Sequence, residues 1–266
     1  HINNLIWKNS MYNNSQHTFK THDQTELFYQ HWESLSQKNT PNANKKAIIL
    51  FHRGHEHSDR MAHLVDELKL TDFDFFAWDA RGHGDSPGAR GDAPSFSACV
   101  KDIQYFLQHI QHQYGIDENN IAIIGQSVGA VLSATWVHDY APKIRALCLA
   151  SPAFDIKLYV PFAEPGLRVL NHIKGNFFIQ SYVKSSMLTH DKERAQTYDT
   201  DPKIARSISV RMLLGLYDAS KRIVADAQNI FVPTQVLCSG SDFVVQQKPQ
   251  RDFYDKLPHP QKEFHV

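Results

Sequence analysis

Apolar positions follow two different periods along the chain, and these periods predict its strands and helices. Short continuous apolar runs, which are typical of strands buried on both faces of a parallel sheet, lie at 47–51, 74–79, 121–124, 144–150 and 234–239. Apolar residues at helical spacing lie between these runs, at 59–70, 96–114, 130–140 and 248–257. Because strands alternate with helices, the sequence predicts an α/β fold with a mostly parallel sheet flanked by helices.

Two segments depart from this alternation. Residues 17–32 alternate between apolar and polar positions on either side of Asp23-Gln24, which predicts two short antiparallel strands. Residues 153–228 show several helical patterns and no clear strand, and therefore predict a helical cap inserted into a sheet protein. The core is then expected to comprise 1–152 and 229–266. Its last strand begins at Glu263, and we expect this strand and the helix after it to be incomplete.

Composition narrows the classes of function. Lys plus Arg and Asp plus Glu both equal 28, and this balance argues against a nucleic-acid binder, which normally carries a basic excess. No apolar run approaches the roughly 20 residues that a membrane-spanning helix needs. The three cysteines are far apart and match no metal-ligand spacing, so we expect no metal and no cofactor. They favour a reducing, cytoplasmic location, with a membrane-peripheral position as the alternative.

The segment Gly125-Gln126-Ser127-Val128-Gly129 follows one predicted strand and precedes a predicted helix. This is the sequence form of a nucleophile elbow, in which a serine on a sharp strand-to-helix turn holds its hydroxyl clear of the sheet. The helix N-terminus behind the serine favours developing negative charge. Ser127 is therefore the predicted nucleophile, and the alternative is an ordinary glycine-rich turn.

Two further segments carry a resemblance to a known family. Residues 51–58 read Phe-His-Arg-Gly-His-Glu-His-Ser, and residues 78–86 read Trp-Asp-Ala-Arg-Gly-His-Gly-Asp-Ser. Together with the elbow, they resemble segments of α/β-hydrolases of the monoacylglycerol lipase and lysophospholipase type, which are related to the serine aminopeptidases of family S33. The same segments also resemble, more distantly, those of hydrolase domains that are fused to a C-terminal methyltransferase in some bacterial proteins.

The resemblance implies roles for particular residues. It implies an oxyanion hole formed by the backbone N–H groups of Gly54 and Val128, although Arg53 and His55 stand where the family usually has glycine. It implies that residues 79–86 are structural, so His83 is not expected to be a catalytic base. It also implies that Asp242, in the turn after the strand at 234–239, is the carboxylate of the catalytic triad.

The histidine of the triad has no match in the sequence. Only His259 and His265 follow Asp242, and the family places its histidine in a loop some residues past the last strand. The catalytic histidine is therefore expected beyond Val266, with His265 as the alternative.

These residues predict a serine hydrolase that cleaves carboxylic esters, with a monoacylglycerol, a lysophospholipid or another lipid-like ester as its substrate. An aminopeptidase or amide hydrolase shares the fold and the triad, and a non-catalytic regulatory domain is a second alternative. The predicted cap supplies candidates for an acyl pocket, and the alternative for some of them is that they belong to the ordinary core. These candidates are Phe154, Leu158, Tyr159, Val160, Pro161, Phe162, Leu167, Phe177 and Phe178.

Overall fold

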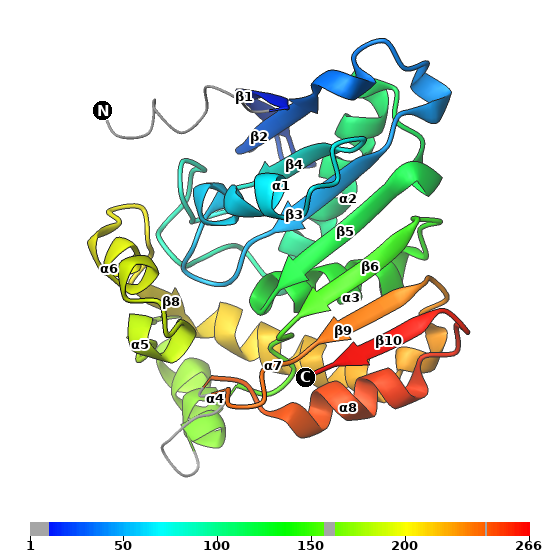
Figure 1. Cartoon of the computed structure of the whole chain (residues 1–266). Coiled ribbons are helices and arrows are strands. Elements are labelled where there is room, and N and C mark those ends of the chain that lie inside the picture. The colour runs from blue at the N-terminus through cyan, green and yellow to red at the C-terminus, as the bar shows by residue number, and fades with distance from the viewer. Residues whose placement is uncertain (1–10, 157–162, 243) are drawn as a thin grey trace.

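The computed structural model describes residues 11–156, 163–242 and 244–266, which form one eight-stranded sheet covered by helices (Figure 1). The strand order is β1-β2-β4-β3-β5-β6-β9-β10, and every neighbouring pair from β4 to β10 is parallel. The predicted mostly parallel sheet is therefore confirmed. Its strands are β1 (Tyr12–Lys20), β2 (Glu26–Ser34), β3 (Ala47–Phe51), β4 (Asp74–Trp78), β5 (Ile121–Gln126), β6 (Ala146–Ala150), β9 (Thr234–Leu237) and β10 (Lys262–His265).

The helices largely follow the predicted pattern, with one clear exception. Instead of one helix over 59–70, a 3-10 turn is followed by a short α-helix, and Leu68 and Leu70 are more than a third exposed. Ser58, a plausible N-cap from the sequence, instead begins the 3-10 turn, and its Oγ accepts from Gln30 Nε2 at 2.8 Å. The α-helices are α1 (His63–Glu67), α2 (Phe96–Tyr114), α3 (Val128–Tyr140), α4 (Ala163–Lys174), α5 (Ser185–Leu188), α6 (Lys192–Thr200), α7 (Val210–Ala225) and α8 (Gln247–Lys256).

The central strands are buried on both faces, as their continuous apolar runs predict. Successive residues of β3 belong to two different core clusters: Ile49 belongs to one and Ile48 to the other. The larger cluster lies between the sheet and the helices α2, α3, α7 and α8, whereas the smaller one lies against α1. Since successive side chains of a strand point to opposite faces, this division is what the sequence pattern requires.

The segment between β6 and β9 holds α4, α5, α6 and α7, which the sequence predicts as helical. It also contains two short antiparallel strands, β7 (Phe178–Gln180) and β8 (Ser207–Ser209). The expectation that this segment has no strand is therefore wrong. Figure 1 shows α4, α5 and α6 beyond the carboxyl ends of the central strands, toward which the arrows of β5 and β6 point.

The register of the parallel strands brings four chain segments to one edge of the sheet. Phe51 pairs with Gly125, Gly125 with Leu149, and Leu149 with Val236. The loops after β3, β5, β6 and β9 therefore start at the same level. Because β4 and β5 flank β3 on opposite sides, the strand order also reverses direction here, and ligands of open α/β sheets bind at such a switch point.

A buried arginine ties the outer strands to α2. Arg81 Nε donates to Asp102 Oδ2 at 2.6 Å, and its Nη1 donates to Asp23 Oδ2 at 2.7 Å. The Asp102 side chain is fully buried. The hydrogen bond from Arg81 lowers the pKa of the Asp23 carboxyl far below its usual range.

Replacing Arg81 by methionine is expected to lower the free energy of unfolding by roughly 3–5 kcal/mol, because it leaves the buried Asp102 charge without its partner. Urea unfolding followed by circular dichroism measures this change. The matched control is Arg168→Met, since the Arg168 ion pairs with Glu164 and Asp218 are largely exposed and are worth about 1 kcal/mol or less. Equal losses in the two variants would contradict the role given to Arg81.

Candidate active site

Ser127 occupies a strained turn between β5 and α3. Its backbone has a φ of 54° and a ψ of −114°, a region that residues with a Cβ rarely adopt. The turn is fixed from both sides, because the Ser127 N–H donates to Ala150 O at 2.9 Å and the Ser127 carbonyl accepts from Ala130 at 3.1 Å. This strained turn matches the predicted nucleophile elbow.

The two glycines of the elbow are required by close approach of other atoms. A Cβ on Gly129 would lie 2.4 Å from the carbonyl oxygens of both Phe51 and His52. A Cβ on Gly125 would lie 2.7 Å from Ser133 Oγ. Side chains at these positions would push α3 away from β3 and β5, so the motif spacing reflects packing as well as chemistry.

The predicted oxyanion-hole residues lie next to each other. A Cβ on Gly54 would be 3.0 Å from Val128 Cγ2, so the loop after β3 contacts the first turn of α3. Neither the Gly54 N–H nor the Val128 N–H donates a hydrogen bond to another described residue. His55 has a φ of 71°, a left-handed conformation that glycine adopts with least strain. This conformation explains why glycine is usual at this position in the family pattern, and His55 adopts it here despite having a side chain.

The buried histidines beside the elbow are engaged structurally. His52 bonds Arg53 O through Nδ1 and accepts from the Ala80 N–H through Nε2. His83 bonds Arg81 O at 2.8 Å. Burial lowers the pKa of His52 to about 4 and that of His83 to about 3, so both rings are neutral near pH 7. The geometry supports a structural role for His83, as the sequence suggests.

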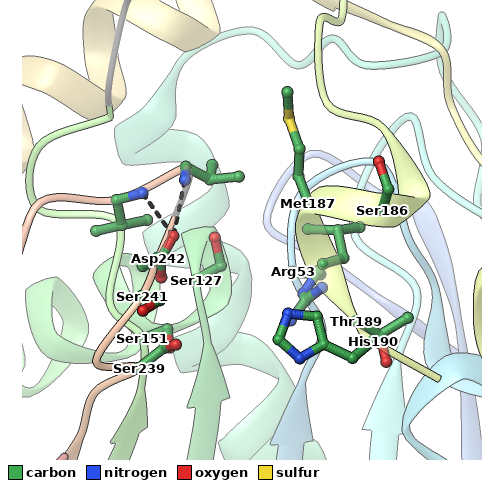
Figure 2. A pocket seen from close by; sticks show the side chains of 13 residues that line it. Arg53, Ser127, Ser151, Ser186, Met187, Thr189, His190, Ser239, Ser241 and Asp242 are labelled. Atoms are coloured by element: carbon green, nitrogen blue, oxygen red, sulfur yellow. Dashed lines mark hydrogen bonds between the residues drawn. The ribbon is translucent and has the colours of Figure 1, made fainter.

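Asp242 faces the same polar cavity as Ser127 (Figure 2). The backbone N–H groups of Val244 and Val245 donate to its Oδ1 at 2.7 and 2.9 Å. These bonds hold the carboxylate in the turn after β9. The cavity has a volume of about 240 Å³, and its hydroxyl-bearing residues are Ser127, Ser151, Ser186, Thr189, Ser239 and Ser241. We call it the polar cavity.

The two histidines that follow Asp242 do not line the polar cavity. His259 precedes β10 and so lies at the opposite edge of the sheet, where its Nδ1 accepts from the Gln261 N–H. His265, which the sequence left as the alternative base, is exposed and bonds Glu263 Oε2 at 3.0 Å.

His190 does line the polar cavity, although no motif in the sequence includes it. Figure 2 shows its ring across the cavity from Asp242 and Ser127. It follows the short helix α5, and no local sequence pattern relates it to the elbow 63 positions earlier. Only the tertiary fold brings these residues to one cavity.

A second and larger cavity opens from Ser127 on the cap side. Its volume is about 730 Å³, and Ser127, Leu188 and Arg53 line both it and the polar cavity. We call it the apolar cavity, because its walls are mainly hydrocarbon. These walls include Val128, Ile156, Leu167, Leu170, Ile179, Met212, Leu213 and Leu216.

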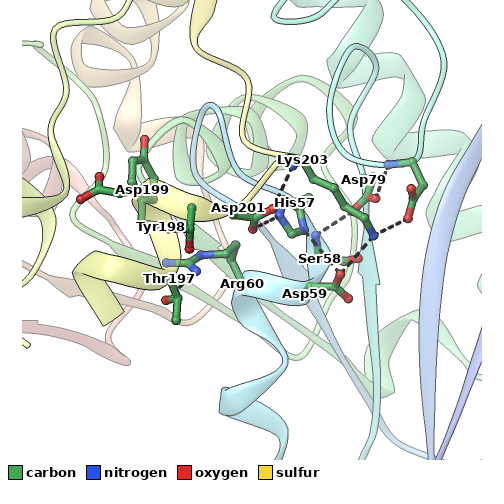
Figure 3. Close-up of polar contacts among 12 residues, drawn as sticks. His57, Ser58, Asp59, Arg60, Asp79, Thr197, Tyr198, Asp199, Asp201 and Lys203 are labelled. Atoms are coloured by element: carbon green, nitrogen blue, oxygen red, sulfur yellow. Dashed lines mark hydrogen bonds and ion pairs between the residues drawn. The ribbon is translucent and has the colours of Figure 1, made fainter. Parts of the chain in front are cut away.

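The segment between β6 and β9, which the sequence predicts to be a cap, is bonded directly to the loop that carries Gly54. His57 Nε2 lies 2.6 Å from Asp201 Oδ2, and the Ala205 N–H donates to His55 O at 2.8 Å (Figure 3). These contacts join the segment before β8 to the residues just after Gly54. The position of the cap and the shape of the proposed oxyanion loop are thus mechanically coupled.

Within the described residues, no group of three or more His, Cys, Asp or Glu side chains is arranged to hold a metal ion. None of the described helices combines the length and the apolar character that crossing a membrane requires. All three cysteines are free thiols.

The mostly parallel sheet, the elbow after β5 and the helical layers define an α/β-hydrolase. A family model described as serine aminopeptidase, S33, matches residues 42–266, and the chain belongs to this family. The expected kinship with monoacylglycerol lipases is confirmed by a sequence relative: the chain is 26% identical to the monoglyceride lipase of Rattus norvegicus over 228 residues, which are 84% of this chain and 71% of the lipase.

A second relative is more similar in sequence. The chain is 53% identical over 251 residues to the uncharacterized protein YnbC of Escherichia coli K12, an alignment that covers 94% of this chain. This chain therefore spans 42% of the length of that protein. The comparisons do not support the expected methyltransferase neighbour.

Solved structures confirm the fold. The monoacylglycerol lipase of Paleococcus ferrophilus superimposes with a TM-score of 0.76 at 21% identity, over 96% of this chain and 88% of that one. A monoglyceride lipase of Saccharomyces cerevisiae gives a TM-score of 0.78 at 17% identity, over 97% and 86%. At these identities the likeness establishes the α/β-hydrolase fold alone.

Proposed function

We propose that the protein is a serine hydrolase that cleaves the carboxylic ester of a single-chain lipid, such as a monoacylglycerol or a lysophospholipid. The observation that carries the proposal is the place of Ser127, which lies where a polar and an apolar cavity meet. A lipid ester has the same division, with a hydrocarbon chain on one side of the carbonyl and a polar alcohol on the other. The names of the lipase relatives agree with this substrate class.

In the proposed reaction, Ser127 Oγ attacks the ester carbonyl and forms an acyl-enzyme, which water later hydrolyses. The N–H groups of Gly54 and Val128 would stabilise the oxyanion, because donors fixed in advance need no reorganisation in the transition state. Asp242 would orient the histidine base and stabilise its protonated form.

The register of β10 supports a place for the base. Leu237 pairs with His265 in parallel, so the position directly after β10 lies at the same sheet edge as the turn that carries Asp242. We assign the base to a histidine beyond Val266, in a loop that continues from this edge of the sheet. His190 is the competing candidate, since it lines the polar cavity.

The acyl chain is assigned to the apolar cavity, whose volume is within the usual range for ligand pockets. Of the cap residues considered from the sequence, Leu167 lines this cavity. Phe154 instead packs on Phe253, with ring centroids 4.7 Å apart, and Phe178 is 47% exposed. Residues 158–162 lie outside the described residues.

For p-nitrophenyl esters from acetate to decanoate, we expect kcat/KM to rise with chain length until the apolar cavity is full. Each added methylene that becomes buried contributes up to about 0.8 kcal/mol, or roughly fourfold. Leu167→Trp is expected to shift the optimum to shorter chains. Val169→Trp is the matched control, since Val169 lies on the same helix but is 58% exposed.

A flat chain-length profile would contradict the lipid assignment. A preference for aminoacyl p-nitroanilides over esters would instead favour the aminopeptidase reaction. If a protein that continues past β10 cleaved no substrate of either class and a fluorophosphonate probe did not label its Ser127, the non-catalytic alternative would hold. The cytoplasmic location expected from the cysteines stays a prediction.

A further inference from the structure

Arg53 stands where three cavities meet. It follows β3 in the loop that carries Gly54 and lines both the polar and the apolar cavity. It also lines a third cavity of about 360 Å³. Its side chain is only 20% exposed, and its buried Nε has no hydrogen-bond partner among the described residues. A buried guanidinium with an unused donor is costly unless a ligand satisfies it.

The third cavity gathers two more arginines around Arg53. Arg60 and Arg194 line it, together with the hydroxyl groups of Ser185, Thr189 and Thr197. We call it the arginine cavity. It shares Arg53, Leu188 and Thr189 with the polar cavity, so the two are neighbours. It also shares Arg53, Leu188 and Tyr198 with the apolar cavity, so it adjoins both of the cavities that meet at Ser127.

Three arginines and two carboxylates line the arginine cavity, so its formal charge is positive. Asp59 already accepts from Gln30 Nε2 at 2.6 Å and lies 3.3 Å from Lys203 Nζ. Glu56 Oε2 is 4.0 Å from Arg53 Nε, beyond hydrogen-bond distance, and burial raises the pKa of the Glu56 carboxyl.

Arg60 has a free charge as well. It donates to Thr197 Oγ1 at 3.1 Å and lies over the Tyr198 ring (Figure 3), but it forms no ion pair with a described carboxylate. Arg194, in contrast, is paired with Glu67 at 2.9 Å. Arg53 and Arg60 are thus the two cations that a ligand would meet.

We propose that Arg53 and Arg60 bind a phosphate on the alcohol side of the substrate, which makes the preferred substrate a single-chain glycerophospholipid ester and not a neutral monoacylglycerol. This inference rests on the proposed ester hydrolysis at Ser127. Guanidinium groups bind phosphate through paired, charge-assisted hydrogen bonds. The Thr189 hydroxyl, which accepts from the Asp191 N–H, can still donate its own hydrogen to a further phosphate oxygen. Glycine at position 53, as in the family pattern, would supply no such charge.

The test compares decanoyl glycerol phosphate with decanoyl glycerol. We expect the Ser127→Ala protein to bind the phosphate ester more tightly in calorimetry, and the active protein to show a higher kcat/KM for it. Arg60→Gln should lower the preference for the phosphate ester by roughly ten- to a hundredfold, as loss of charge-assisted bonds does. Arg60→Lys should retain part of the preference, because it keeps the charge. Thermal unfolding of each variant checks that the fold is intact.

Lys248→Gln is the control for net charge, since it removes one positive charge from the exposed face of α8, where Lys248 is 83% exposed. It should leave the preference unchanged. Equal binding of the two esters, or a preference that survives Arg60→Gln, would overturn the inference while leaving ester hydrolysis intact. Inorganic phosphate that bound as tightly as the lipid would also overturn it, by showing a free-anion site. Loss of all ester turnover with phosphate-selective binding retained would instead contradict the proposed reaction alone.

Discussion

Replacing Ser127 by alanine is expected to lower kcat for p-nitrophenyl butyrate by roughly 10⁴- to 10⁶-fold, provided that the triad is complete. The alanine variant has no nucleophile at the elbow, so only binding and the oxyanion donors remain to assist attack by water. Labelling by a fluorophosphonate should disappear in parallel. Alanine keeps the Cβ that makes this backbone conformation strained, so the variant is expected to fold about as stably as the parent protein.

Ser133→Ala is the matched control for this experiment. Ser133 lies in α3, the helix that follows Ser127, and its Oγ donates to Gly129 O at 2.6 Å. It lines neither the polar nor the apolar cavity. Its loss should leave turnover within a few-fold of the parent value. Hydrolysis or labelling that persisted in Ser127→Ala would show that the nucleophile is elsewhere.

The second large effect concerns the base. A version of the protein that continues past β10 is expected to hydrolyse the same ester roughly 10⁴-fold faster than the chain that ends at Val266, since a serine without a base is a weak nucleophile near neutral pH. Steady-state kinetics on the two proteins, at matched active-site concentration, measures the difference. The β10 register supports this expectation, because it directs the chain after His265 toward the Asp242 turn.

His190→Ala, made in both proteins, separates the two candidate bases. If the base follows β10, this change should alter turnover by less than about tenfold in the longer protein, because it removes only a cavity wall. If the chain ending at Val266 is as active as the longer one and His190→Ala abolishes that activity, the base is His190. In that case our assignment to a histidine beyond Val266 is wrong.

The sequence was most informative where the structure depends on local patterns. The parallel strands could be predicted because continuous apolar runs are required by burial on both faces. The elbow could be predicted because Gly129 must admit Phe51 and His52, and Gly125 must admit Ser133. The shortest elements could not be predicted. The three-residue strands β7 and β8 are too short to show alternation, and they exist because they pair with each other.

Residues that depend on distant contacts were also missed. The helix predicted over 59–70 begins only at His63, after a 3-10 turn. In that turn Ser58 bonds Gln30 through its hydroxyl and Asp79 through its N–H, contacts that no local pattern indicates. The polar cavity unites Arg53, Ser127, His190 and Asp242, which are separated by dozens of positions in the chain. For Arg53, the departure from the family's glycine was visible in the sequence, but its place between three cavities appears only in the fold.

The bonds between the cap and the loop after β3 have a consequence for how this protein can change. His57 holds Asp201, and His55 accepts from Ala205, so the cap cannot shift outward without pulling on the residues beside Gly54. Widening the entrance for a bulkier lipid would therefore disturb the alignment on which the rate depends. Selection for a new substrate and selection for a higher rate act on the same few bonds. Variants that accept a broader range of substrates are therefore expected to turn over more slowly at first.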